Sequence, residues 1–181
     1  MRRGLSYDER VEFLAGDVVV RPVRPRDLDA LIDLIADHAA FERSEVDRNH
    51  LRGALPQNIF GEVPRAVILV ADLDHDIVGY LAASIEFSTW QAAEYLHMDC
   101  LYLTPECRGQ GAGRMLMDAA VLYADERGLG WMEWQTPDWN AYAIGFYERL
   151  GAVAKSKVRF SLAVEGTSGA VPEPACGDAG V

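Results

Sequence analysis

Hydrophobic residues recur with helical spacing in several stretches of this chain. In the clearest stripe, further apolar residues follow the first one after three, four, seven and eleven positions. This spacing is typical of an amphipathic helix with one buried face. Its members are Leu28, Leu31, Ile32, Ile35 and Ala39. The pattern predicts helices over residues 25–42, 47–55, 111–127 and 140–150. The second of these is expected to end before Pro56, because proline interrupts helical hydrogen bonding.

Short runs of β-branched and other apolar residues separate these helices and predict strands. The runs cover residues 17–21, 65–72, 77–87, 94–103 and 131–136, with a last strand within 152–164. A turn at residues 74–76 joins two of them into an antiparallel hairpin, whereas the late alternation of strand and helix favours parallel pairing. The expected fold class is α/β, with a mixed, mostly antiparallel sheet that is flanked by helices on both faces.

The 181 residues suit one domain of ordinary size. We expect the folded domain over residues 16–164, after an N-terminal extension of residues 1–15. Residues 165–181 are glycine, proline, acidic and small residues without a large apolar anchor. This composition predicts a flexible tail.

Charge and composition narrow the classes of function. The chain has 28 acidic and 17 basic residues and a formal net charge of −11, which disfavours nucleic-acid binding. No apolar run suits a signal peptide or a membrane span, and three cysteines are typical of a reducing compartment. The four histidines show no metal-site spacing. We expect a cytoplasmic protein with no nucleic-acid partner, no membrane partner and no metal.

The segment 101–116 reads LYLTPECRGQGAGRML, in the order strand, glycine-rich turn, helix. Glycines allow a ligand to approach the backbone, and a helix start offers free N–H groups to an anion. These glycines are Gly109, Gly111 and Gly113. Arg108 and Arg114 can add charge-assisted contacts to phosphate. The segment therefore predicts a pyrophosphate site, although its spacing fits neither a dinucleotide nor a nucleoside-triphosphate loop.

The turn reads R-x-x-G-x-G, and N-x-x-A-x-x-F-Y-x-x-x-G follows over residues 140–151. This pair of motifs resembles the GNAT superfamily of acetyl-CoA-dependent N-acetyltransferases over nearly the whole predicted domain. The resemblance implies the acyl-CoA acyltransferase fold, acetyl-CoA as the acyl donor and a homodimer. It also implies a set of residues that bind the donor: Leu101, Tyr102, Leu103, Arg108, Gly109, Gln110, Gly111, Ala112, Gly113, Arg114, Asn140 and Ala143.

The same resemblance assigns chemical roles. Tyr147 matches the family's general acid, which protonates the thiolate leaving group, although its position also suits a core aromatic residue. The backbone of residues 101–103 is implied to meet the oxyanion and to pair with the pantetheine amides. Asn140 suits a simple helix N-cap and, by resemblance, a hydrogen bond to the cofactor arm. Both roles of Asn140 are compatible.

An alkyl amine has a pKa of about 10.4, so it arrives mostly protonated at neutral pH. A nearby carboxylate can hold the ammonium and accept its proton, directly or through water. The candidates are Glu42, Glu86, Glu94 and Asp99, and the resemblance favours Asp99 and Glu42. A narrower similarity to diamine and polyamine acetyltransferases rests on residues 41–42, 87–90, 99, 139–140 and 146–147. Where that subgroup tends to carry Glu-Asp, this chain has Asp99-Cys100.

Four residues are the candidates for binding the acceptor: Glu42, Trp90, Glu94 and Asp99. Trp90 and Trp139 suit the walls of an amine site through cation–π contact, and they suit core or interface aromatics equally well. His97 is expected to share a strand face with Asp99.

The expected function is acetyl transfer from acetyl-CoA to the primary amine of a small, cationic acceptor, by direct attack in a ternary complex. Two alternatives stay open, namely a protein or peptide N-acetyltransferase and a non-catalytic acyl-CoA-binding sensor. A sensor would have no need of Tyr147 or of acidic residues beside the donor.

Overall fold

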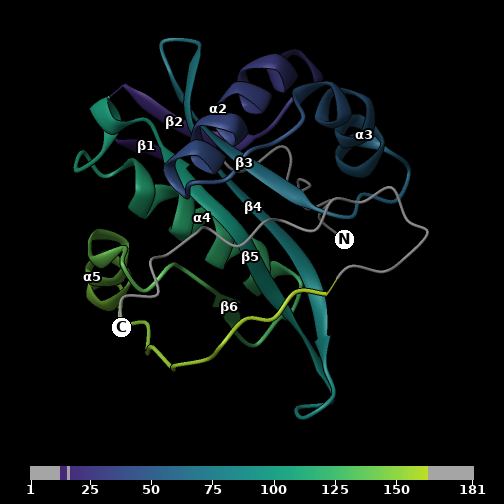
Figure 1. Ribbon diagram of the computed structural model, residues 1–181, viewed down its shortest axis with the longest axis vertical. Helices are drawn as coiled ribbons and strands as arrows, with labels where there is room; N and C mark the ends of the chain where they lie inside the picture. Colours follow the sequence, from purple (N-terminus) through teal and green to yellow (C-terminus); the bar gives the residue numbers. More distant parts are fainter. Residues whose placement is uncertain (1–12, 16, 163–181) are drawn as a thin grey trace, which may run out of the picture. The chain divides into compact units, whose positions relative to one another are not determined.

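The computed structural model describes residues 13–15 and 17–162. A six-stranded sheet runs through the structure in the order β1-β2-β3-β4-β5-β6 (Figure 1). Its strands are β1 (Phe13–Ala15), β2 (Val18–Pro22), β3 (Val67–Leu73), β4 (Asp76–Ser88), β5 (Ala93–Leu103) and β6 (Met132–Trp134). Neighbours from β1 to β5 pair antiparallel, and β6 pairs parallel with β5. The expectation of a mixed, mostly antiparallel sheet is confirmed.

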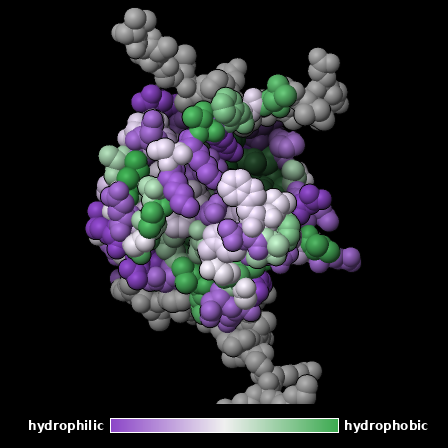
Figure 2. Space-filling model, turned by 90° about the horizontal axis from the view of Figure 1, so that it is seen from below, coloured by the Kyte–Doolittle hydropathy of each residue, from purple (hydrophilic) through white to green (hydrophobic). Residues whose placement is uncertain are grey.

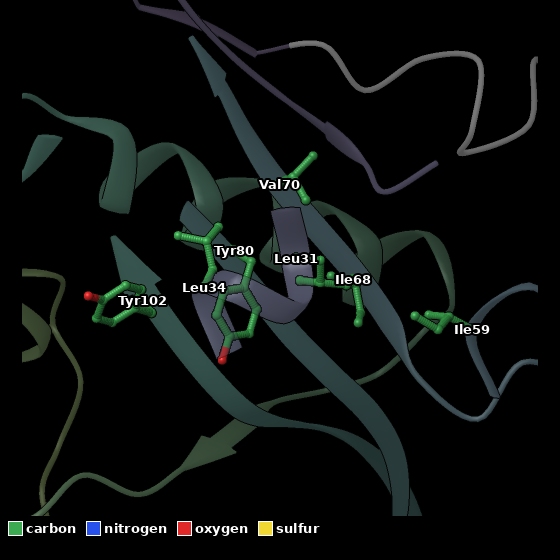
Figure 3. Packing of buried hydrophobic residues seen from close by; sticks show 7 residues of the cluster. All are labelled: Leu31, Leu34, Ile59, Ile68, Val70, Tyr80 and Tyr102. Atoms are coloured by element: carbon green, nitrogen blue, oxygen red, sulfur yellow. The ribbon is translucent and has the colours of Figure 1, made fainter. Parts of the chain in front are cut away.

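Helices cover both faces of this sheet, as expected. The described part of the chain forms the α-helices α2 (Leu28–Phe41), α3 (Arg48–Phe60), α4 (Ala112–Glu126) and α5 (Ala141–Arg149). In Figure 1, α2 and α3 lie in front of the sheet and α4 behind it. Leu31 and Leu34 of α2 pack with Ile68, Val70 and Tyr80 of the sheet (Figure 3). Of the apolar stripe predicted for α2, Leu31 lies in this core and Ile35 packs against it, whereas Leu34 was not part of the predicted stripe.

The described residues divide into two compact units. One unit contains residues 13–15, 17–38 and 46–135, and therefore all six strands. The other contains residues 39–45 and 136–162, and therefore α5. The end of α2 and the loop after it thus belong to the same unit as α5.

A buried ion cluster fixes the start of α2 to the sheet. Arg21 of β2 donates two hydrogen bonds to Asp27, at 2.6 and 3.1 Å, and two to Asp72 of β3, at 3.0 and 2.8 Å. Burial alone would raise the pKa of Asp27, but hydrogen bonds from Arg21 and the Arg24 N–H, together with the charge of Arg21, hold it below its ordinary value. All three charged side chains are buried, so each depends on the others.

Strand β5 contains a bulge that the sequence did not reveal. Ala82 of β4 pairs with Cys100, whereas the next residue, Ala83, pairs with Met98. Asp99 is the extra residue between these two pairs. A bulge interrupts the alternation of faces along a strand. Simple alternation therefore does not decide whether His97 and Asp99 share a face, and that expectation stays a prediction.

Helix α3 continues through Pro56 and ends at Phe60, so the expectation that it stops at residue 55 is wrong. Proline removes one hydrogen bond within a helix. Beyond it, Ile59 is buried in the core, and Leu55 and Phe60 pack against the same cluster. This packing holds the last turn in place. At its start, the Asp47 side chain accepts hydrogen bonds from Asn49 N and His50 N, at 2.8 and 3.1 Å.

At the two ends of the predicted domain, the structure also differs from the sequence-based expectations. Strand β1 lies within the stretch that was expected to be an extension, and it pairs with β2. Residues 152–162 form no strand, which contradicts the last predicted strand, and residues 163–164 lie outside the described residues. The predicted tail, residues 165–181, also lies outside them. Alternating side chains favour a strand, but a strand forms only where a neighbouring backbone accepts its hydrogen bonds.

Hydrophobic and hydrophilic residues are interspersed over the face drawn in Figure 2. Within the described part of the chain, we find no helix with the length and apolar character that crossing a membrane requires.

Candidate functional site

The turn before α4 leaves the start of that helix uncapped. After the 3-10 helix Pro105–Cys107, the chain passes through two glycines in the left-handed region, Gly109 with φ 73° and Gly111 with φ 94°. No side chain caps the helix, and Met115 N donates to Gly111 O at 3.1 Å. The N–H groups of the first turn have no partner within a helix. This turn therefore presents backbone donors to an external anion.

The space around these two glycines is open. A Cβ atom placed on Gly109 or Gly111 would meet no protein atom within 4 Å. The backbone angle, rather than crowding by the protein, is what requires glycine at these two positions. Ala112 is buried and anchors the first turn in the core. The residues present thus fit a pyrophosphate held by backbone amides at a helix start.

The two arginines of this segment contact the protein itself. Arg108 Nε donates to Leu103 O at 3.0 Å. Arg114 Nε donates to Asp118 at 2.8 and 3.0 Å, within α4. Next to Arg108, Gln110 Nε2 donates to Glu106 O at 2.7 Å. The groups of this turn that are open to an anion are therefore the backbone amides. The side chains of Arg108 and Gln110 bind backbone oxygens of the turn itself.

A ring cluster supports the end of β5, where the turn begins. The Nδ1 atom of His38 lies 3.0 Å from the Tyr80 hydroxyl oxygen, and the His38 ring stacks on Tyr102 with centroids 5.2 Å apart. The Arg108 guanidinium lies 5.4 Å from the Tyr102 ring centroid. Burial, with the nearby charge of Asp37, raises the pKa of Tyr102. Sequence reasoning did not assign His38 or Tyr80 to the site, because residues so distant along the chain carry no motif.

The acidic candidates on the sheet differ in their surroundings. Asp99, at the bulge, is exposed and accepts a contact from Cys100 Sγ at 3.5 Å. Glu94 is exposed near the end of the β4–β5 hairpin. Glu86 accepts a hydrogen bond from the Tyr95 hydroxyl at 2.7 Å, which raises the pKa of Tyr95 to about 12. Glu86 is therefore already engaged, whereas Asp99 stays compatible with the predicted base.

The hairpin turn between β4 and β5 carries Trp90, whose side chain is 92% exposed. A tryptophan this exposed is not a core residue, so the core alternative for Trp90 is wrong. A binding or interface role for this side chain remains compatible with its position.

The second unit contains the motif of residues 140–151, which begins at the start of α5. Asn140 is the N-cap, and its Oδ1 atom accepts a hydrogen bond from Ala143 N at 3.1 Å. The structural role expected of Asn140 is therefore confirmed. Tyr147 lies further along α5 and is half-buried, with its ring 5.2 Å from that of Phe146. It is neither a fully buried core residue nor a fully exposed one.

Glu42 belongs to this same unit, in the loop after α2. The residues on either side of it both contact Trp139. The Phe41 and Trp139 rings lie 5.7 Å apart, and the Arg43 guanidinium lies 5.4 Å from the Trp139 ring centroid. The structure thus groups Glu42 with Asn140 and Tyr147 in one unit. The cation in contact with Trp139 is therefore the guanidinium of Arg43, whereas the sequence had suggested an amine ligand.

Among the residues that the structure describes, no group of three or more His, Cys, Asp or Glu side chains is arranged to hold a metal ion.

Comparison with known protein families gives one match that spans most of the chain. The model of the Acetyltransferase (GNAT) family matches residues 30–152. This range includes the turn before α4 and all of α5.

Several curated proteins are similar in sequence. A thialysine N-epsilon-acetyltransferase of Caenorhabditis elegans is 28% identical over 148 residues, covering 81% of this chain and 91% of that protein. The bovine (Bos taurus) protein of the same name is 28% identical over 143 residues, covering 75% and 84%. A peptidyl-lysine N-acetyltransferase of Salmonella typhimurium is 30% identical over 119 residues, covering 62% and 72%.

Solved structures share the fold. An aminoglycoside acetyltransferase from an uncultured soil metagenomic sample has a TM-score of 0.68 and 23% identity, and the match covers 84% of this chain and 100% of that chain. At this level of identity, the likeness extends to the fold alone.

Proposed function

Because this chain belongs to the GNAT acetyltransferase family and is an N-acetyltransferase, we propose that it moves an acetyl group from acetyl-CoA to a primary amine of a small, cationic acceptor. The observation that carries the proposal is the uncapped start of α4, reached through Gly111 at φ 94°. A diphosphate is the part of acetyl-CoA that such a site fits.

Acetyl-CoA supplies an acetyl group activated as a thioester. The amine nitrogen forms a bond to the acetyl carbonyl carbon, and the bond from that carbon to sulfur breaks. A carboxylate, Asp99 or Glu42, accepts the proton that the amine loses. Tyr147 gives a proton to the sulfur as it leaves, so the products are an amide and the free thiol of CoA. Backbone amides of residues 101–103 stabilise the charge that develops on the carbonyl oxygen.

The nature of the acceptor is proposed on two grounds. The chain carries a formal charge of −11, which attracts cations. Similar proteins include enzymes named for thialysine, D-amino acids and L-ornithine, all of them small amines. A protein lysine is the second candidate, because one similar enzyme is named a peptidyl-lysine N-acetyltransferase.

We also propose a homodimer. Four apolar side chains within the short segment 152–162 are largely exposed, and apolar residues that are exposed together mark a surface for protein interaction. They are Val153, Val158, Phe160 and Leu162. Burial of this segment against a second copy would give its alternating pattern a strand partner. Light scattering at several concentrations tests this, and a monomer at micromolar concentration contradicts it.

The function is tested by measuring the release of free CoA thiol in the presence of acetyl-CoA and a panel of amines. The panel contains diamines, polyamines, amino acids with side-chain amines, amino sugars and lysine peptides. The proposal predicts that at least one small amine accelerates thiol release and is recovered as its N-acetyl derivative. Tight binding of acetyl-CoA with no accelerating amine would instead identify a sensor. Acceleration by lysine peptides alone would favour the protein acceptor.

A further inference from the structure

The C-terminal end of α2 places an arginine where a glycine is usual. Ser44 N donates to Ala39 O at 2.8 Å, and Arg43 N donates to Ala40 O at 3.0 Å. This pair of hydrogen bonds is the Schellman motif, whose left-handed position glycine normally occupies. Arg43 takes that position with φ 60°. A side chain there strains the backbone, so its presence points to a use for the side chain.

The Arg43 side chain is directed to the start of α5. Its guanidinium lies 5.4 Å from the Trp139 ring centroid, and Phe41 contacts the same ring at 5.7 Å. Trp139 directly precedes Asn140, the cap of α5. Both ends of this contact belong to the unit that contains Glu42 and Tyr147. Arg43 is therefore held beside the helix that carries the proposed general acid.

Among the described residues, no carboxylate forms an ion pair with Arg43. Arg48 and Arg52, on the following helix, form ion pairs with Asp33 and Asp29. Within residues 13–15 and 17–162, Arg43 forms no such pair, and it is exposed. A guanidinium stacked on an aromatic ring keeps its N–H donors at its edge, where they can bind a carboxylate in bidentate fashion.

We propose that Arg43 binds a carboxylate of the acceptor, so that the preferred acceptor is an amino acid with a side-chain amine rather than a plain diamine. The inference rests on the proposed function, because it takes acetyl transfer to an amine as given. Glu42 is its neighbour in the chain, and a carboxylate can hold the ammonium group of the same molecule. Two adjacent residues of opposite charge then recognise a zwitterion, with Trp139 as the platform for the arginine.

The test compares matched acceptors that share chain length and amine but differ in the carboxylate. The pairs are L-lysine with 1,5-diaminopentane, L-ornithine with 1,4-diaminobutane, and L-2,4-diaminobutyrate with 1,3-diaminopropane. In at least one pair the wild-type enzyme should prefer the amino acid by 10- to 100-fold in kcat/KM, the range of a charge-assisted hydrogen bond. Arg43→Gln should reduce this preference about tenfold or more while leaving kcat/KM for the diamine unchanged.

Arg43→Gly separates recognition from folding. Glycine relieves the strained backbone at the end of α2, so this variant should melt at the same or a higher temperature and still lose the preference. Arg48→Gln is the matched control, because it removes an exposed arginine of the neighbouring helix, and it should keep the wild-type preference. The KM for acetyl-CoA should stay unchanged in all three variants.

Three results would overturn the inference. The wild-type enzyme could use both members of every pair equally well, or Arg43→Gly could slow both members equally. The variants could also raise the KM for acetyl-CoA at an unchanged preference, which would assign Arg43 to a phosphate of the donor. Failure of the proposed function is a different result, since then no amine of any pair accelerates thiol release.

Discussion

The starts of α4 and α5 meet the same physical requirement in opposite ways. Both helices begin with N–H groups that have no partner inside the helix. At α5, Asn140 Oδ1 accepts a hydrogen bond from Ala143 N at 3.1 Å. At α4, the N-cap is Gly111, which has no side chain to offer, and no other side chain caps the helix. One helix start is capped by a side chain of its own sequence, and the other has no side-chain cap.

The start of α3 is capped as well. The Asp47 side chain accepts hydrogen bonds from Asn49 N and His50 N, at 2.8 and 3.1 Å. The protein thus has the means to cap a helix with an aspartate or an asparagine. A bare glycine before α4, in a turn braced by Arg108 and Gln110, is what the proposed donor site requires.

The largest effect is expected from Gly111→Val. A β-branched residue at φ 94° is strained, and its side chain would fill the open space where the diphosphate is proposed to bind. We expect acetyl-CoA affinity to fall by more than about 100-fold, measured by calorimetry. Gly128→Val is the control, because Gly128 also has a positive φ, 69°, and an open Cβ position, but lies at the other end of α4. If both variants bind acetyl-CoA as the wild type does, the start of α4 is not the donor site.

Replacing Asp27 by Asn is expected to lower the free energy of unfolding by about 3–5 kcal/mol at pH 7, since it leaves a buried arginine partly unpaired. The pKa of Asp27 is lowered in the folded protein, so its contribution is complete above the ordinary pKa of 3.8 and is lost as the pH falls through the folded value. The difference between wild type and Asp27→Asn should therefore shrink in urea titrations below about pH 4.

Asp33→Asn provides the control for that measurement. Asp33 pairs with Arg48 at an exposed position, and such pairs contribute about 0–1 kcal/mol. A loss as large as that of Asp27→Asn would show that the burial of the Arg21 cluster is not the cause. Neither variant should change acetyl-CoA affinity in the folded protein, because α4 begins elsewhere.

Tyr147→Phe tests what α5 contributes beyond its cap. We expect turnover to fall about 100-fold, the lower end of the range for general acid catalysis, because a thiolate leaves readily. Acetyl-CoA affinity should change little. Tyr142→Phe, at an exposed position of the same helix, should keep wild-type turnover. An equal loss of affinity and turnover in Tyr147→Phe would make this residue structural.

The identity of the base can be assigned to one of the two units. Asp99 belongs to the unit with the sheet, and Glu42 belongs to the unit with α5. We expect Asp99→Asn to lower kcat/KM for the amine by about tenfold or more and to shift its pH profile. Glu42→Gln is the matched variant. If only Glu42→Gln shifts the profile, the base comes from the second unit, and an unchanged profile in both variants would contradict a direct role for either carboxylate.

The smallest effect is expected from Asn140→Ala. Loss of an N-cap costs about 1 kcal/mol, which differential scanning calorimetry would record as a lower melting temperature. Asn140→Asp keeps a capping oxygen and should restore most of that stability. A change in acetyl-CoA affinity at unchanged stability would show that Asn140 contacts the donor in addition to capping α5.

The sequence predicted the elements that rest on local pattern. Patterns among neighbouring residues predicted helix α2, the hairpin of β3 and β4, and the glycine turn before α4. The structure confirms all three elements. The bulge at Asp99 and the passage of α3 through Pro56 were missed, because pairing with β4 and packing of Ile59 decide them. Both features depend on contacts between residues that are far apart in the sequence, so a local pattern cannot predict them.

The candidate site shows the same division. The two motifs and their resemblance to the family gave Gly111, Asn140 and Tyr147 as candidates, and the structure bears out the capping role of Asn140. They gave no sign that His38 stacks on Tyr102, since these residues meet only in the folded sheet. Arg43 is also marked locally in the sequence. No glycine directly follows the helix predicted over residues 25–42, so another residue, Arg43, takes the left-handed position at its end.

The central claim is that the bare amides at the start of α4 bind the diphosphate of CoA. The direct measurement is the backbone ¹H–¹⁵N spectrum of the protein titrated with CoA and, separately, with pantetheine, which lacks the diphosphate. We predict that the amide signals of Gly111, Ala112 and Gly113 move with CoA and stay in place with pantetheine. If CoA binds and these three signals do not move, the diphosphate is held elsewhere and the account is contradicted.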